Sequence, residues 1–277
     1  MSSNPSSDTQ SAAAGRPVTP LGRGLRKMIP LVLALAVLAL LAMVLPGPLY
    51  RLGAVGLGTA FRLIRYGAYG GMAAVALGVL ALLVCAVTKA PVRPVALTLL
   101  TIVLGAVAWG IPYLWLKKAE AVPAIHDITT DTRNPPQFLP DVIALRTAAH
   151  AANSTVYGGP EVAALQHRAY PDIRPMIFQQ PPATVFAAAL STVKHMGWTL
   201  DSAHPRMGII EASSTTLWFG FTDDVVIRIE AQPDGTRLDI RSESRIGESD
   251  VGRNAARIRR FRAMLYHKLG LPAPKVP

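Results

Sequence analysis

Two short polar segments carry the residue types that catalysis or ligand binding requires. Residues 126–136 read H-D-I-T-T-D-T-R-N-P-P, which places an imidazole, two carboxylates, three hydroxyls and an amide within eleven residues. Residues 241–250 read R-S-E-S-R-I-G-E-S-D and lead into a basic helical pattern. In such a setting His126 can act as a base with Asp127 or Asp131 as its partner carboxylate. The candidate ligand-binding residues are His126, Asp127, Thr129, Thr130, Asp131, Asn134, Arg241, Ser242, Ser244, Arg245, Asp250, Asn254 and Arg257.

Each segment also has a purely structural interpretation. In 126–136, the Asp, Thr and Asn side chains can hydrogen bond to neighbouring backbone groups and shape a proline-rich turn. In 241–250, serine, glycine and arginine ahead of a helix can hold an anion on free backbone N–H groups. The same residues can instead form a capped loop that is closed by salt bridges. Residue types alone favour the structural interpretation of both segments.

We expect no cofactor and no metal site. An adjacent His126-Asp127 pair lacks a second set of ligands, and the other histidines show no ligand spacing. The single cysteine, Cys85, lies in an apolar stretch, so the C-terminal half has no thiol for zinc, a disulfide or nucleophilic attack. The sequence also lacks a nucleophile elbow, a phosphate-binding glycine loop and an H-E-x-x-H motif. An enzyme is therefore less well supported than a binding domain.

Three long stretches without a charged side chain, residues 28–50, 66–88 and 94–116, precede a polar half that begins at Lys117. Crossing the hydrocarbon of a bilayer takes about 20 mostly apolar residues, so we expect three transmembrane helices. None of them carries an interior charge or histidine of the kind that marks transport pathways, so we interpret them as an anchor. The apolar piece 52–61 is too short to cross and is expected at the interface.

Glycines recur in the second stretch at Gly67, Gly70, Gly71 and Gly78. They can let helix backbones approach closely. Glycine is also common in membrane helices in general, and this abundance is the simpler interpretation.

The formal net charge of +11 comes mostly from the membrane half. Residues 1–116 carry nine Lys and Arg against one acidic residue, whereas residues 117–277 carry nineteen against sixteen. Basic residues beside membrane spans set orientation and meet anionic lipid, so we expect a lipid bilayer and no nucleic acid as partner. Four basic residues before the first span and three after it favour a cytoplasmic N-terminus. Three crossings then place the C-terminal domain outside the cytoplasm.

The pattern divides the chain into four parts. We expect a disordered basic tail over 1–27, a three-helix membrane anchor over 28–116, a proline-rich extended segment over 117–182 and an α+β soluble domain over 183–277. The proline-rich segment is apolar enough to wrap the domain. Within it, short helices are expected near 141–152 and 160–167.

The soluble domain is predicted to be an α+β fold with two layers, a four-stranded antiparallel meander flanked by two helices. A first helix over 183–196 ends at Gly197, and a last helix over 250–269 begins with Ser249 or Asp250 as its N-cap. The four strands are expected near 199–203, 208–215, 224–231 and 237–243.

The last two strands form the clearest element. The turn sequence Q-P-D-G between them predicts a hairpin. Pairing Ala231 with Thr236 sets Ile229 opposite Leu238 on one face and Glu230 opposite Arg237 on the other. A shift by one residue would set charges opposite aliphatic side chains, so the pattern favours this register.

Four motifs, taken in order, resemble the family known only as domain of unknown function 1499. They are 126–136, M-G-W at 196–198, G-F-T-D-D at 220–224 and the run 241–260. The resemblance covers residues 121–269 and leaves out the membrane stretches. It implies a domain of bacterial envelopes and plastids, without an activity. It also makes one shared ligand-binding surface of the two polar segments as well supported as their structural interpretation.

Together these observations predict a multi-pass protein of a bacterial inner membrane with a periplasmic C-terminal domain. The favoured function is non-enzymatic binding of an envelope ligand, either a lipid, a wall fragment or a protein. The alternative is a hydrolase or lyase that uses His126 with Asp127 or Asp131.

Overall fold

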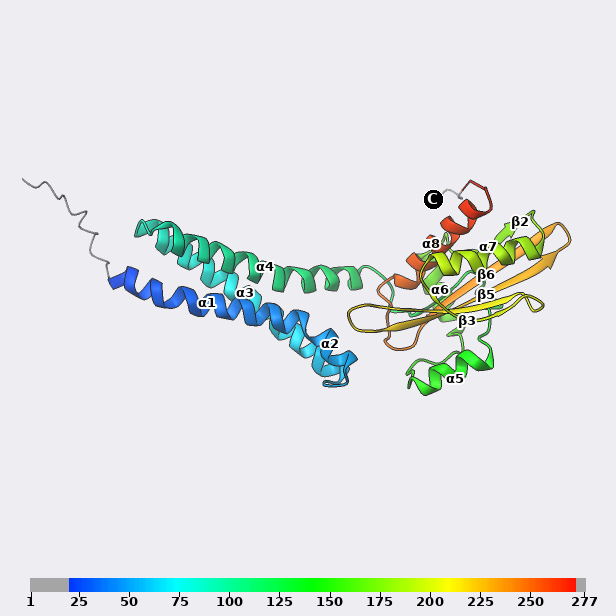
Figure 1. Cartoon of the computed structure of the whole chain (residues 1–277), viewed down its shortest axis with the longest axis horizontal. Helices are drawn as coiled ribbons and strands as arrows, with labels where there is room; N and C mark the ends of the chain where they lie inside the picture. Colours follow the sequence, from blue (N-terminus) through cyan, green and yellow to red (C-terminus); the bar gives the residue numbers. More distant parts are fainter. Residues whose placement is uncertain (1–19, 273–277) are drawn as a thin grey trace, which may run out of the picture. The chain divides into compact units, whose positions relative to one another are not determined.

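A computed structural model describes residues 20–272 of the chain (Figure 1). Two compact units result: one runs up to Leu45 and resumes over Phe61–Pro112, and the other combines Pro46–Ala60 with the residues from Tyr113 onward. The connection between the first two long helices thus belongs to the same unit as the C-terminal domain. Residues 1–19 of the expected tail lie outside the described part.

Within residues 20–272, three helices are long and apolar enough to cross a membrane, as predicted. They are α1 (Pro20–Val44), α3 (Leu57–Val87) and α4 (Val92–Glu120). Two boundaries differ from expectation. Residues 20–27, which were assigned to the tail, form the first turns of α1, because a helix can continue past the apolar core into the head-group region. The connection contains a short helix, α2 (Pro46–Arg51), which lies just before the expected interfacial piece 52–61. Within that piece, residues 52–56 form a turn and the remainder is the start of α3.

The glycines of α3 allow close helix packing, so the simpler interpretation from abundance was wrong. A Cβ atom on Gly67 would lie 2.8 Å from the carbonyl oxygen of Ala39 in α1. A Cβ atom on Gly71 would lie 2.7 Å from the carbonyl oxygen of Gly105 in α4. Real Cβ atoms essentially never approach this closely, so α3 meets both neighbours through positions that only glycine fits.

The predicted meander is present in the C-terminal unit, and the hairpin register is confirmed. Ile229 pairs with Leu238, and Glu230 pairs with Arg237. The aliphatic side chains therefore share one face and the charged ones the other. The four strands are β3 (Thr199–His204), β4 (Ile209–Thr215), β5 (Thr222–Gln232) and β6 (Gly235–Ser244).

Two short strands that were not predicted extend the sheet to six. Strands β1 (Asp127–Thr129) and β2 (Met176–Phe178) both pair antiparallel with β6, on the edge that β5 leaves open. Each has three residues, too few to show an alternating pattern, and each lies between prolines. The proline-rich segment is therefore part of the sheet and its core, and not only a wrapping of the domain.

Among the described residues, four helices complete the domain (Figure 1). The core contains Val185 and Val193 of one helix, Phe261 and Leu265 of another, and Leu238 of the sheet. This packing forms the two predicted layers. On the opposite sheet face, Val142 packs with Phe138 and Val226. The helices are α5 (Pro140–Ala148), α6 (Gly159–Ala169), α7 (Pro182–His195) and α8 (Arg253–Lys268); α7 and α8 form the layer on the main core face, and α5 covers part of the other.

Candidate functional site

The fold brings the two polar segments side by side. Asp127 pairs with Glu243 and Thr129 with Arg241, because β1 runs along the end of β6. Successive side chains of a strand point to opposite faces. The candidate residues therefore separate into a group on the face that α5 covers and a group on the face that α8 covers.

The first group is a charged cluster centred on Arg241, whose side chain is 0% exposed. The guanidinium donates to both carboxylate oxygens of Asp127, at 3.0 and 2.8 Å, and to Glu243 at 3.2 Å. Its remaining N–H groups reach the carbonyl oxygens of Pro136 and Thr155. All of these acceptors are fixed by the fold, so Arg241 joins β6, β1 and the following loops. The charged cluster consists of Asp127, Arg146, Asp224, Arg241, Glu243 and Arg245.

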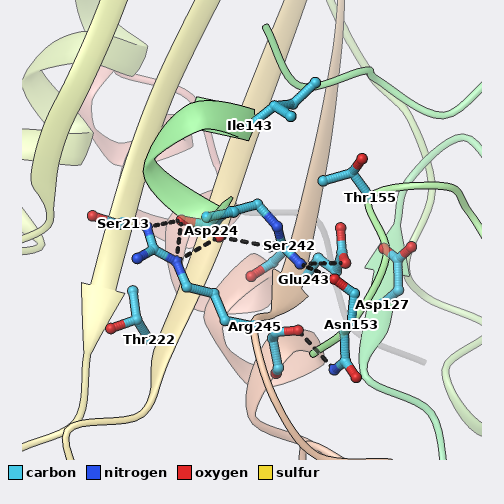
Figure 2. Close-up of polar contacts among 12 residues, drawn as sticks. Asp127, Ile143, Asn153, Thr155, Ser213, Thr222, Asp224, Ser242, Glu243 and Arg245 are labelled. Carbon is cyan, nitrogen blue, oxygen red and sulfur yellow. Dashed lines mark hydrogen bonds and ion pairs between the residues drawn. The ribbon is translucent and has the colours of Figure 1, made fainter. Parts of the chain in front are cut away.

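Three members are not among the residues that the sequence predicts for the site: Arg146 of α5, Asp224 and Glu243. Of these, Arg146 alone lies outside the four motifs. It donates to Asp224 at 2.6 Å and to Glu243 at 2.8 Å. Figure 2 shows Asp224 and Glu243 with Arg245, which also binds Asp224, at 2.7 Å. The available signal was the spacing of Arg146 from Val142, because residues four apart lie on the same face of a helix.

The charged cluster combines three arginine and three acidic side chains that pair with one another. An unpaired charge would be very costly in such a buried place, whereas a paired and hydrogen-bonded one is tolerated. The aromatic ring of Phe138 also lies 5.1 Å from the Arg241 guanidinium and 5.8 Å from that of Arg146. The contacts of Asp127, Arg241 and Arg245 are thus explained by folding alone.

The surroundings of Glu243 shift the pKa of its carboxyl group. Burial raises its pKa from 4.5 to about 8, and the nearby carboxylates of Asp127 and Asp224 add to the rise. Arg146 and Arg241 act in the opposite direction. The folded protein therefore holds a proton on Glu243 more tightly than the unfolded chain does.

This difference predicts a pH dependence of stability. Since the folded state binds more protons between about pH 4.5 and 8, the contribution of Glu243 to the free energy of unfolding falls as the pH rises through that window. Substituting Glu243→Gln should flatten the curve, whereas Glu230→Gln at an exposed position should not. Urea unfolding of the full chain in detergent at several pH values, followed by tryptophan fluorescence, checks this. Parallel curves for wild type and Glu243→Gln would contradict it.

The second group, the Asn254 cluster, lies under the start of α8. Asn254 accepts from Ser242 at 2.8 Å and donates to Ser244 at 3.1 Å and to the backbone oxygen of His126 at 2.8 Å. Arg257 donates to Asn254, to Ser242 and to Asp223. The Asn254 cluster consists of Asp223, Ser242, Ser244, Asn254 and Arg257, all buried.

Asp250 has a capping role, although it is not the N-cap residue. Helix α8 begins at Arg253 and its N-cap is Gly252, whose φ of 75° suits glycine. The prediction of Ser249 or Asp250 as N-cap was therefore wrong. The Asp250 carboxylate still accepts the backbone N–H groups of Gly252 and Asn254, both at 2.7 Å. The positive φ lets the chain turn back over this carboxylate.

His126 does not pair with either proposed acid. Its ring nitrogen Nδ1 lies 3.4 Å from the backbone oxygen of Glu248. Both carboxylate oxygens of Asp127 are bound by Arg241, on the other face of the strand. Asp131 accepts from two other arginines and from two backbone N–H groups of its own turn. Within residues 20–272, no hydrogen bond links the imidazole to a carboxylate.

Asp131 and Asn134 instead line an open pocket of about 610 Å³. The pocket lies beside β6, where Thr130 binds both Asp239 and the backbone of Ile240. The arginine and histidine residues that line the pocket are not among those that the sequence predicts for the site; they are Arg133, His167, Arg174 and Arg237. Of these residues, only Arg133 lies within one of the four motifs.

Most of the predicted ligand-binding residues are buried. Thr129 is held by the side-chain amide of Gln166, which donates to its carbonyl and accepts from its N–H. No group of three or more His, Cys, Asp or Glu in the described part of the chain could hold a metal ion. The buried candidates are Asp127, Thr129, Thr130, Arg241, Ser242, Ser244, Asp250, Asn254 and Arg257, whereas His126, Asp131, Asn134 and Arg245 reach solvent.

These features define an α+β domain with a six-stranded antiparallel sheet, preceded by three helices that could cross a membrane. The chain belongs to the family described as "Protein of unknown function (DUF1499)", whose model matches residues 127–265, half of its length. A search of the curated proteins found no match. The matched range includes both clusters and the pocket loop and excludes the three apolar helices.

Proposed function

We propose that this chain is a membrane-anchored binding domain that holds an anionic envelope ligand in the pocket beside β6. One observation carries the proposal. Arg133, Arg174 and Arg237 line the pocket together with His167, whereas the carboxylate of Asp131 is already bound by Arg237 at 2.6 Å. Guanidinium groups bind carboxylates and phosphates through paired N–H groups.

The side chains of the pocket suit such a ligand. Arg174 is oriented by a hydrogen bond from its Nε to the backbone oxygen of Pro171, at 2.8 Å. His167 and the Thr132 hydroxyl lie 3.0 Å apart and offer further polar contacts. A lipid head group and a wall fragment both carry anionic groups of this kind, so either can supply the ligand.

The catalytic alternative has less support. General acid–base catalysis needs an oriented acid within reach of the base, and His126 has neither Asp127 nor Asp131 as a partner. We therefore favour binding without turnover. The proposal also keeps the domain on the periplasmic side of a bacterial inner membrane, as the charge balance favours, and reporter fusions after Pro277 test that side.

Binding to two soluble probes tests the proposal. The full chain, in nanodiscs of neutral phosphatidylcholine, is titrated with glycerol phosphate as a head-group probe and with N-acetylmuramic acid as a wall probe. Arg133→Ala combined with Arg174→Ala should weaken binding of the preferred probe at least about tenfold, or about 1.4 kcal/mol. The matched control combines Arg206→Ala with Arg253→Ala at two exposed positions outside the pocket.

The two outcomes against the proposal are distinct. Equal affinity of the pocket variant and the control would exclude this pocket. Conversion of either probe, seen by mass spectrometry and lost in His126→Ala, would replace the binding role by the enzymatic alternative.

A further inference from the structure

The connection between β4 and β5 is unusually apolar for a hairpin loop. Residues 216–221 read T-L-W-F-G-F. Leu217 is 92% exposed, although a leucine side chain is most often buried in a folded protein. Phe219 stacks on Phe221 with ring centroids 4.9 Å apart, so the loop has its own small aromatic core behind the exposed tip.

This loop contacts helix α2, and both belong to the same compact unit. Arg51 donates from Nη1 to the backbone oxygen of Leu217 at 2.6 Å. The ring of Tyr50 lies 5.8 Å from that of Phe219 and 5.9 Å from that of Phe221. The helix and the loop therefore form one surface, although Arg51 and Leu217 are 166 positions apart in the sequence.

Helix α2 is tied covalently to the end of a membrane-span helix. Helix α1 ends at Val44, and α2 begins at Pro46, so only Leu45 intervenes. Consecutive Cα atoms are about 3.8 Å apart, so α2 must lie directly beside the C-terminal end of α1. Tyrosine, tryptophan and arginine are the residues that favour this boundary.

We propose that the 216–221 loop is a second membrane contact of the C-terminal domain. Together with α2 it forms an interfacial surface in which Leu217 and Trp218 enter the boundary between head groups and acyl chains. The exposed apolar tip is small, whereas a stable protein interface takes about 800 Å² from each partner. Its size and its contact with α2 therefore favour lipid as the occupant over a partner protein. The inference is independent of the ligand pocket, which lies beside β6.

Site-specific labelling tests the contact in the full chain. Cys85→Ala removes the single cysteine, and a bimane fluorophore is then placed at Leu217→Cys. The matched control is Met207→Cys, because Met207 is also an apolar residue and is 58% exposed. It lies in the turn before β4, whereas Leu217 lies after β4, so the two labels are at opposite ends of this strand. Leu52→Cys, at the end of α2 and 81% exposed, reports the interface next to α1.

In nanodiscs that contain lipid with a nitroxide near the top of the acyl chain, Leu217 and Leu52 should be quenched at least about threefold more than Met207, since interfacial groups lie about 5–10 Å into the boundary. Aqueous iodide should quench only Met207 strongly. Strong iodide quenching at Leu217 would overturn the proposal, even if the nitroxide lipid quenches the label at Leu52. Protection of Leu217 from both quenchers would show that the loop is covered by this chain or by a second copy of it, and would likewise overturn the proposal.

Discussion

Replacing Arg241 by methionine is expected to prevent stable folding of the C-terminal domain. Methionine fills similar space but leaves Asp127 and Glu243 buried without their shared guanidinium. Removing one partner of a buried ion pair costs about 3–5 kcal/mol, and a whole domain is stable by only about 5–15 kcal/mol. The measurement is resistance of the C-terminal domain to limited proteolysis, combined with urea unfolding of the full chain in detergent.

Two further variants separate charge from packing. Arg253→Met changes an exposed arginine and should leave the free energy of unfolding within about 0.5 kcal/mol of wild type. Arg241→Met combined with Asp127→Asn removes the guanidinium together with the carboxylate whose two oxygens it binds, keeps Arg146 on Asp224 and Glu243, and should recover part of the loss. Wild-type protease resistance in Arg241→Met alone would show that the charged cluster does not hold the domain together.

Replacing Asn254 by leucine is expected to have the second largest effect. The amide satisfies the Ser242 and Ser244 hydroxyls, the His126 carbonyl and the Arg257 guanidinium. Leucine is close in volume and can bond to none of them. Each buried group left without a partner costs about 1–3 kcal/mol, so the total loss should be at least about 3 kcal/mol.

The control for Asn254 is Gln179→Leu, an exposed amide on the loop after β2. It should unfold at the urea concentration of the wild type. A midpoint for Asn254→Leu equal to that of Gln179→Leu would mean that the Asn254 cluster contributes no stability. The cluster would then be free to serve a ligand, contrary to our assignment of binding to the pocket beside β6.

The sequence by itself determined the elements that local patterns encode. Three uncharged stretches of sufficient length indicated the long helices, because hydrophobic length is a local property. The register of Ile229 with Leu238 and of Glu230 with Arg237 followed from alternation on both sides of a turn. Helix α7 was predictable for the same reason, because its apolar spacing and the glycine that follows it, Gly197, are close together in the chain.

Only the tertiary structure decided which polar residues meet. Asp127 and Arg241 are 114 positions apart, and Arg146 and Glu243 are 97 apart, so no periodicity connects them. Strands β1 and β2 have three residues each and exist because the open edge of β6 accepts their hydrogen bonds. The alternation of β6 then sends Arg241 to one face and Ser242 to the other. A signature that reads as one polar site along the chain thereby becomes two buried clusters and one open pocket.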